Sequence, residues 1–142
     1  MGEWHHPEHY SEQAKGFARA MRVAEIDVFV QAALPTLIGA ARHHGYALAR
    51  HGSEARDLDL IAIPWTESAS DADSLIEALC EATRQATGWG HWSHRGHRGE
   101  REQKPHGRVA VMILATAEVH IDLSVMPRVP AGLDAVIPDH LR

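Results

Sequence analysis

Residues 52–65 read GSEARDLDLIAIPW, and this segment decides the expected fold. Its second half, residues 57–65, is rich in leucine and isoleucine and closes on a proline, a pattern typical of a β-strand. Successive side chains of a strand point to opposite faces, so Leu58 and Leu60 share one face while Ile61 and Ile63 share the other. Because both faces carry large apolar side chains, we expect this strand to lie in the middle of a sheet that is covered on both sides.

The same strand begins with two acidic side chains, Asp57 and Asp59, which share one face because they are two positions apart. Like charges held close together repel unless a cation neutralises them, and Mg²⁺ prefers carboxylate oxygens. A third carboxylate, Asp122, lies between Ile121 and Leu123 in a later apolar stretch. If the two strands are neighbours, about 4.8 Å apart, the three aspartates meet. They are therefore the predicted catalytic residues and ligands of a two-ion site.

Directly before the acidic pair, Gly52 and Ser53 leave the preceding apolar run and enter a short connection. Free backbone N–H groups and a serine hydroxyl in such a turn can cradle a phosphate, and glycine permits a close approach. A structural interpretation stays open beside this one. In it, Asp57 pairs with Arg50 or Arg56 at the strand end, Asp59 caps a turn and Asp122 faces solvent.

Further elements follow from the spacing of apolar residues on either side of this segment. Residues 23–44 carry an amphipathic stripe that predicts a helix, with Pro35 producing either a kink or a break into two helices. Residues 46–49 predict a strand. Ser70 and Asp73 resemble a capping box for a helix that ends at Gly88. Residues 109–114 and 119–125 predict two antiparallel strands, and residues 89–105 predict a long exposed loop.

Together these elements predict one α+β (or α/β) domain, with a mixed sheet of about four strands flanked by helices. We divide the chain into a helical segment, residues 1–44, a core of catalytic type, residues 45–125, and an irregular tail, residues 126–142. A chain of 142 residues is the size of a single domain.

Composition narrows the class of partner. The formal net charge of −5 argues against a broad nucleic-acid surface. We find no uninterrupted run of about 18 apolar residues and no secretory signal, so we expect a cytoplasmic protein without a membrane partner. The single cysteine, Cys80, fits a reducing compartment and is interpreted as a small, buried or half-buried apolar residue.

The order of these motifs resembles that of a known family. Gly52-Ser53, then Asp57-Leu58-Asp59-Leu60, then Ile121-Asp122-Leu123 are similar to the signature of the nucleotidyltransferase superfamily with the DNA polymerase beta type of fold, in its minimal, single-domain form. The resemblance covers residues 45–125. It implies that the three aspartates bind Mg²⁺ or Mn²⁺ and that Gly52 and Ser53 contact the phosphates of a nucleoside triphosphate.

The resemblance implies a transfer of a nucleotide to an acceptor, which we expect to be a small molecule or a protein. Only three residues separate Ser53 from Asp57, fewer than is usual in the family, and we expect these residues to contain no separate substrate domain. The alternative is therefore a catalytically inactive protein that uses the same fold for binding, as an antitoxin-like partner or an accessory protein of a mobile element.

Basic residues and histidines are concentrated around the predicted loop. Lys104 and Arg108 flank the start of a strand and are the basic residues we expect near the triphosphate, unless they belong to a mixed-charge surface with the neighbouring glutamates. Histidines also recur here and at the N-terminus, without the spacing of an established metal motif, and we interpret them as solvated rather than as a zinc site. They are His5, His6, His9, His91, His94, His97 and His106.

Overall fold

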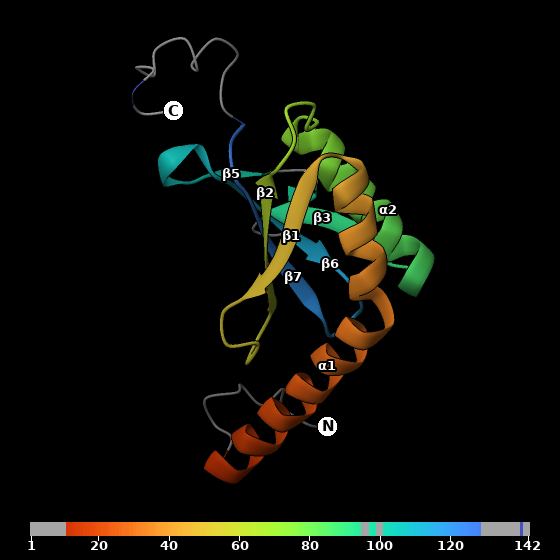
Figure 1. The fold of residues 1–142 in the computed structure, drawn as a ribbon. Helices are drawn as coiled ribbons and strands as arrows, with labels where there is room; N and C mark the ends of the chain where they lie inside the picture. The colour runs from red at the N-terminus through yellow and green to blue at the C-terminus, as the bar shows by residue number, and fades with distance from the viewer. Residues whose placement is uncertain (1–10, 95–96, 99–100, 129–139, 141–142) are drawn as a thin grey trace.

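The structure is a computed structural model, and it describes residues 11–94, 97–98, 101–128 and 140. Over these residues the chain forms an α+β fold with two α-helices, a short 3₁₀ helix and one mixed sheet (Figure 1). In chain order the elements are α1 (Glu12–His43), β1 (Tyr46–His51), β2 (Leu58–Pro64), α2 (Ala72–Thr87), β3 (His91–His94), β4 (His97–Arg98), β5 (Glu102–Gln103), η2 (Pro105–Gly107), β6 (Val109–Leu114) and β7 (His120–Val125).

The strands of the described part lie in the order β1-β2-β7-β6-β3-β4, and β5 pairs with β6 off this path. The pair β2–β7 is parallel, whereas every other pair is antiparallel. Both helices pack on the same side of the sheet (Figure 1). The core between helices and sheet contains side chains with no exposed surface, among them Leu37, Leu58, Leu60, Leu79, Ile121 and Leu123.

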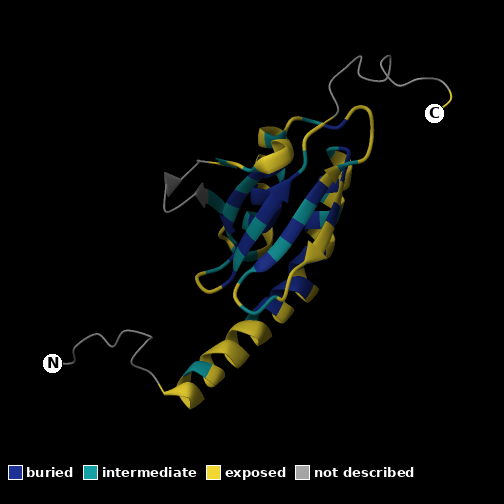
Figure 2. Cartoon of the chain, turned by 90° about the vertical axis from the view of Figure 1, so that its left-hand side faces the viewer, coloured by how far each residue is buried: buried dark blue, intermediate teal, exposed yellow. Residues whose placement is uncertain are grey.

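The central position predicted for β2 is confirmed, because β1 and β7 are hydrogen-bonded to its two edges. The predicted cover on both faces is wrong. Leu58 and Leu60 are buried under the helices, but on the opposite face Ile61 is half-buried and Ile63 is 42% exposed. Figure 2 looks onto this second face, which neither α1 nor α2 covers and which we call the open face.

Helix α1 is longer than predicted and runs through Pro35 as a single element, so the two-helix alternative is wrong. It begins after Ser11, whose hydroxyl accepts a hydrogen bond from the backbone N–H of Ala14 at 3.1 Å. Its buried side chains all lie between Ile26 and Ala41, whereas residues 12–25 project beyond the sheet (Figures 1 and 2). By length and composition alone α1 is also apolar enough to cross a membrane, a test that a core helix passes equally.

Helix α2 ends at Gly88 as predicted, with φ at +81°. Its N-cap differs from the prediction. The cap is Asp71 rather than Ser70, because the Asp71 carboxylate accepts the Ser74 N–H at 2.7 Å. Cys80 on this helix is buried, as predicted, and burial raises the pKa of its thiol to about 12.

The antiparallel pair β6–β7 is confirmed, but the long loop predicted over residues 89–105 is wrong. This segment supplies β3, β4 and β5, which raise the strand number above the predicted four. The apolar strand β6 would otherwise expose a row of unpaired backbone groups at the sheet edge, and β3 covers it, with Trp92 opposite Ile113. Most of the predicted irregular tail lies outside the described residues.

Candidate functional site

The open face brings two of the three predicted aspartates together. Asp59 on β2 and Asp122 on β7 are register partners in adjacent parallel strands, so their side chains leave the same face of the sheet side by side. On the outer neighbours of these strands, His51 on β1 is the register partner of Asp59, and Met112 on β6 is the register partner of Asp122. Both carboxylates are half-buried. The sequence pattern thus predicted the face and the neighbour relation of this pair correctly.

Gly52 lies directly against this pair. Its φ of +77° is a left-handed conformation that favours glycine, and a Cβ added to it would overlap Oδ2 of Asp59. Gly52 therefore lies next to the aspartate pair, as predicted. Ser53 follows it as an exposed residue, and its hydroxyl accepts the Ala55 N–H at 3.4 Å within the same turn.

The short connection after Ser53 is held by an ion pair that the sequence analysis did not predict. The Arg50 guanidinium donates from Nε to Oε1 of Glu54 at 2.6 Å. Glu54 itself adopts a φ of +56°, which is uncommon for a residue with a side chain. The pair joins the end of β1 to the turn, so the three-residue connection is fixed close to the aspartates. Arg50 thus pairs with Glu54, where the structural interpretation had paired it with Asp57.

The charges around Asp59 make its ionisation unfavourable. Burial raises the pKa of Asp59, and the charge of Asp122 raises it further; His51 opposes the rise, and Asp57 and Glu54 add smaller upward contributions. Asp57 stands immediately before β2 and acts on Asp59 through this field. The site therefore concentrates negative charge on a half-buried surface, an environment that favours a bound cation.

The raised pKa of Asp59 predicts a pH-dependent effect of removing its charge. Because the folded state disfavours ionised Asp59, this residue lowers stability progressively as the pH rises from the ordinary Asp pKa to the raised pKa of the folded state, and the full cost is present above it. We expect Asp59→Asn to stabilise the metal-free protein at pH 7, by up to about 1 kcal/mol for this partly exposed group. The gain disappears below the ordinary Asp pKa of 3.8, where the carboxyl is neutral in both states. Urea unfolding at several pH values measures it; a variant that is equally stable or less stable at pH 7 contradicts the account.

The two predicted basic residues occupy different places. Arg108 donates from Nη1 to the hydroxyl of Ser124 at 3.1 Å, and Ser124 shares the open face two residues beyond Asp122. Lys104 instead forms an ion pair with Glu102 at 3.1 Å, next to β5. Arg108 is therefore the better placed of the two to meet an anion on the open face.

The described residues contain no group of three His, Cys, Asp or Glu side chains that could hold a metal ion as they stand. Asp59 and Asp122 supply the paired oxygens that Mg²⁺ prefers, but Asp57 does not complete a three-carboxylate cluster. Of the histidines, His94 and His97 are register partners in the β3–β4 pair, whereas His5, His6 and His9 lie outside the described residues.

Comparisons with models of protein families, with curated proteins and with solved structures found no match to this chain. The case for a function therefore depends on the geometry of the open face and on the order of the sequence motifs. Sequence reasoning missed Glu54 and His51 at this face. A signal for His51 was present, because it ends the strand that precedes Gly52 and so lies next to the acidic pair in an antiparallel hairpin.

Proposed function

We propose that this chain is a metal-dependent protein of nucleotidyltransferase type, which transfers a nucleotide from a nucleoside triphosphate to a small-molecule or protein acceptor. The observation that carries the proposal is the register of Asp59 and Asp122 on neighbouring parallel strands of an open sheet face. Two further observations support it: Gly52 lets the Asp59 carboxylate lie against the turn, and Arg108 beside Ser124 offers a counter-charge for a triphosphate.

In this proposal each described side chain has a definite task. Asp59 and Asp122 would hold the divalent ion, and Asp57 would be its third ligand. When bound, the ion would supply positive charge that offsets the triphosphate and lowers the pKa of the acceptor. Asp122 would accept the acceptor's proton, and the absence of a Cβ on Gly52 leaves the space in which the Asp59 carboxylate lies. Ser53 and Arg108 would supply the phosphate contacts, and Lys104 would join them only on leaving Glu102.

A second candidate is a protein that binds nucleotide or a partner through the same face without catalysis, in an antitoxin-like or mobile-element accessory role. Two observations favour it. The connection between Ser53 and Asp57 is short, and Asp57 does not join the aspartate pair in a group of three.

Release of pyrophosphate separates the two candidates. The assay contains the protein, Mg²⁺, one of the four [α-³²P]nucleoside triphosphates, and a pool of small molecules or proteins. We expect the protein to release pyrophosphate and to label one acceptor in these pools. Asp122→Asn should lower the rate at least about a hundredfold, as expected when a charged group that acts in the reaction is removed. Nucleotide binding without release of pyrophosphate in any pool would favour the noncatalytic candidate.

A further inference from the structure

Strand β1 gives the sheet an edge whose backbone groups are unpaired. In the described part of the chain β1 pairs only with β2, so its other side is an edge of the sheet (Figure 1). Gly45 continues the register of this pair, and its carbonyl accepts the Trp65 N–H at 2.8 Å. Hydrogen-bonded pairs alternate along antiparallel strands, so Tyr46, Leu48 and Arg50 direct their backbone N–H and C=O groups outward. These groups are free to pair with an added strand.

A pocket of about 280 Å³ opens beside the N-terminal half of this edge. Tyr46 and Leu48 of β1, Ile38 of α1 and Trp65 form the apolar part of its lining. A cavity of roughly 150 Å³ holds a benzene ring, so the pocket has room for one large apolar side chain. Trp65 is 80% exposed, the highest fraction for any large apolar side chain in the described part. A side chain bound in the pocket would cover part of this ring.

The pocket also contains a cation without a partner. Arg42, in the last turn of α1, is the one charged residue of the lining. In the described part of the chain its guanidinium forms no hydrogen bond or ion pair. Arg50, at the other end of β1, is already paired with Glu54. Because a guanidinium matches the geometry of a carboxylate, Arg42 favours a carboxylate at this end of the edge.

We propose that this edge binds the carboxyl terminus of a partner protein as an added antiparallel strand. In that arrangement the partner strand ends at the N-terminal end of β1, so its last side chain enters the pocket and its terminal carboxylate reaches Arg42. A parallel strand would bring its beginning to Arg42 instead. Pairing with β1 of a second copy would bring Arg50 and His51 of that copy to this end, and these give Arg42 no counter-charge.

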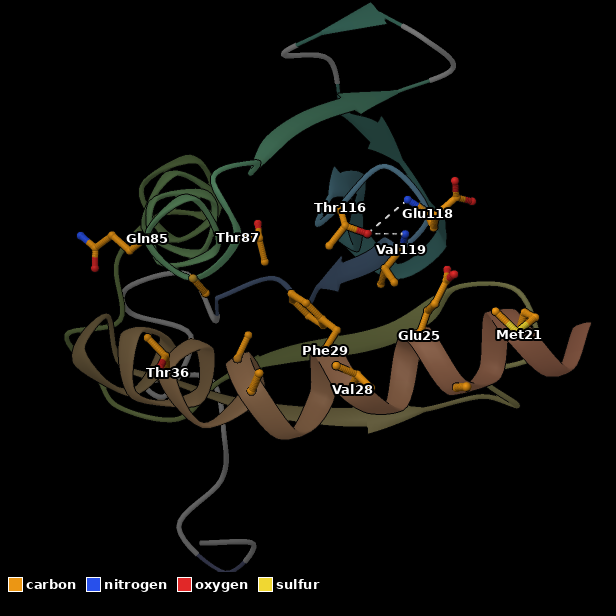
Figure 3. Close-up of a pocket in the computed structure, with 14 residues that line it drawn as sticks. Met21, Glu25, Val28, Phe29, Thr36, Gln85, Thr87, Thr116, Glu118 and Val119 are labelled. Atoms are coloured by element: carbon orange, nitrogen blue, oxygen red, sulfur yellow. Dashed lines mark hydrogen bonds between the residues drawn. The ribbon is translucent and has the colours of Figure 1, made fainter. Parts of the chain in front are cut away.

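A larger groove on the helix side of the molecule differs from this pocket in its charge. It has a volume of about 710 Å³ and lies along α1, with the end of α2 and the β6–β7 turn as its other walls. Figure 3 shows Phe29 and Val119 in these walls, and Glu25 and Glu118 are its two carboxylates. These carboxylates would repel a peptide carboxylate, so the larger groove supplies a control site for purely apolar binding.

Fluorescence anisotropy with a labelled peptide tests the proposal on the full chain. The probe is the heptapeptide Ser-Gln-Thr-Thr-Val-Thr-Leu, with fluorescein at its N-terminus and a free C-terminal carboxylate. We expect a Kd below about 100 μM, and binding at least about tenfold weaker for the C-terminal amide, which lacks the charge that pairs with Arg42. Of two peptides N-methylated at adjacent residues, one should bind as the parent does and the other should not, because only alternate N–H groups face β1.

Substitutions of exposed residues separate the pocket from the rest of the surface. Arg42→Gln should weaken binding of the free acid at least about tenfold and leave binding of the amide unchanged. Arg19→Gln is the matched control, because Arg19 is an exposed arginine on the part of α1 that projects beyond the sheet. Trp65→Ala should weaken binding, whereas Trp89→Ala beyond the end of α2 and Val28→Asp in the larger groove should not. All five side chains are exposed, so the circular dichroism of each variant should match that of the wild type.

Three results for the peptide overturn the proposal: no binding of the free acid at up to about 1 mM protein, equal binding of acid and amide, and equal losses for Arg42→Gln and Arg19→Gln. A loss in Val28→Asp would assign the peptide to the larger groove instead. A wild type that sediments at twice the chain mass of 15.7 kDa and becomes a monomer in Trp65→Ala would assign the edge to a second copy. The Asp59–Asp122 pair takes no part in this binding, so the result is independent of the proposed nucleotidyl transfer.

Discussion

In the presence of Mg²⁺ and a nucleoside triphosphate, the thermal midpoint of the wild type rises, and Asp59→Asn abolishes the rise. A ligand that binds only the folded state adds RT ln(1 + [L]/Kd) to stability, about 2.7 kcal/mol when its concentration is a hundred times Kd. For a chain of this size that corresponds to a shift of roughly 5–10 °C. Asparagine keeps the shape of Asp59 but removes the charge that binds the cation.

The loss of the response in Asp59→Asn must be specific. Asp73→Asn is the matched control, because Asp73 is an exposed aspartate at the start of α2 that pairs with Arg101 at 2.7 Å, away from the Asp59–Asp122 pair. It should respond to Mg²⁺ and nucleotide as the wild type does, and chelation of the metal should remove the response of both. A response of Asp59→Asn equal to that of the wild type would mean that the acidic pair binds no metal.

Gly52→Ala should both destabilise the protein and remove the response to Mg²⁺ and nucleotide. A methyl group at this position would overlap the Asp59 carboxylate, and the φ of +77° is strained for alanine. We expect a loss of about 1–3 kcal/mol in the free energy of unfolding, measured by urea denaturation. The displaced carboxylate would no longer lie beside Asp122, so nucleotide should no longer raise the thermal midpoint.

Gly88→Ala separates backbone strain from the contact with Asp59. Gly88 has a similar φ of +81°, but a Cβ there would meet no atom within 4 Å. This variant should lose stability and keep the full response to nucleotide. If Gly52→Ala also keeps the full response, the closeness of Gly52 to Asp59 has no part in binding.

The predictions from sequence succeeded where alternation of side chains decides the structure. Asp59 and Asp122 each lie between buried residues of an apolar strand, so their common face followed from the period of a strand, and the structure places them in register. The pairing of β6 with β7 followed from two apolar runs joined by a short connection.

The predictions failed where the structure depends on pairing between distant segments or on which face of the sheet contacts solvent. Residues 89–105 have no clear alternation, and they become strands because β6 needs a partner at its edge, which the local sequence does not reveal. The exposure of Ile63 was missed for a related reason. Two apolar faces suggested helices on both sides, whereas both helices pack on the face of Leu58 and Leu60. The Arg50–Glu54 pair depends on a left-handed residue that the sequence does not mark.

Direct counting of bound metal tests the central claim, that Asp59 and Asp122 form a site for a divalent ion and a nucleotide. Electron paramagnetic resonance measures free Mn²⁺ as protein is added in the presence of a nonhydrolysable nucleoside triphosphate. The account predicts at least one Mn²⁺ per chain beyond that held by the nucleotide alone, and its loss in a variant with Asp59→Asn and Asp122→Asn. No binding beyond that of the nucleotide, or equal binding by the wild type and this variant, would contradict it.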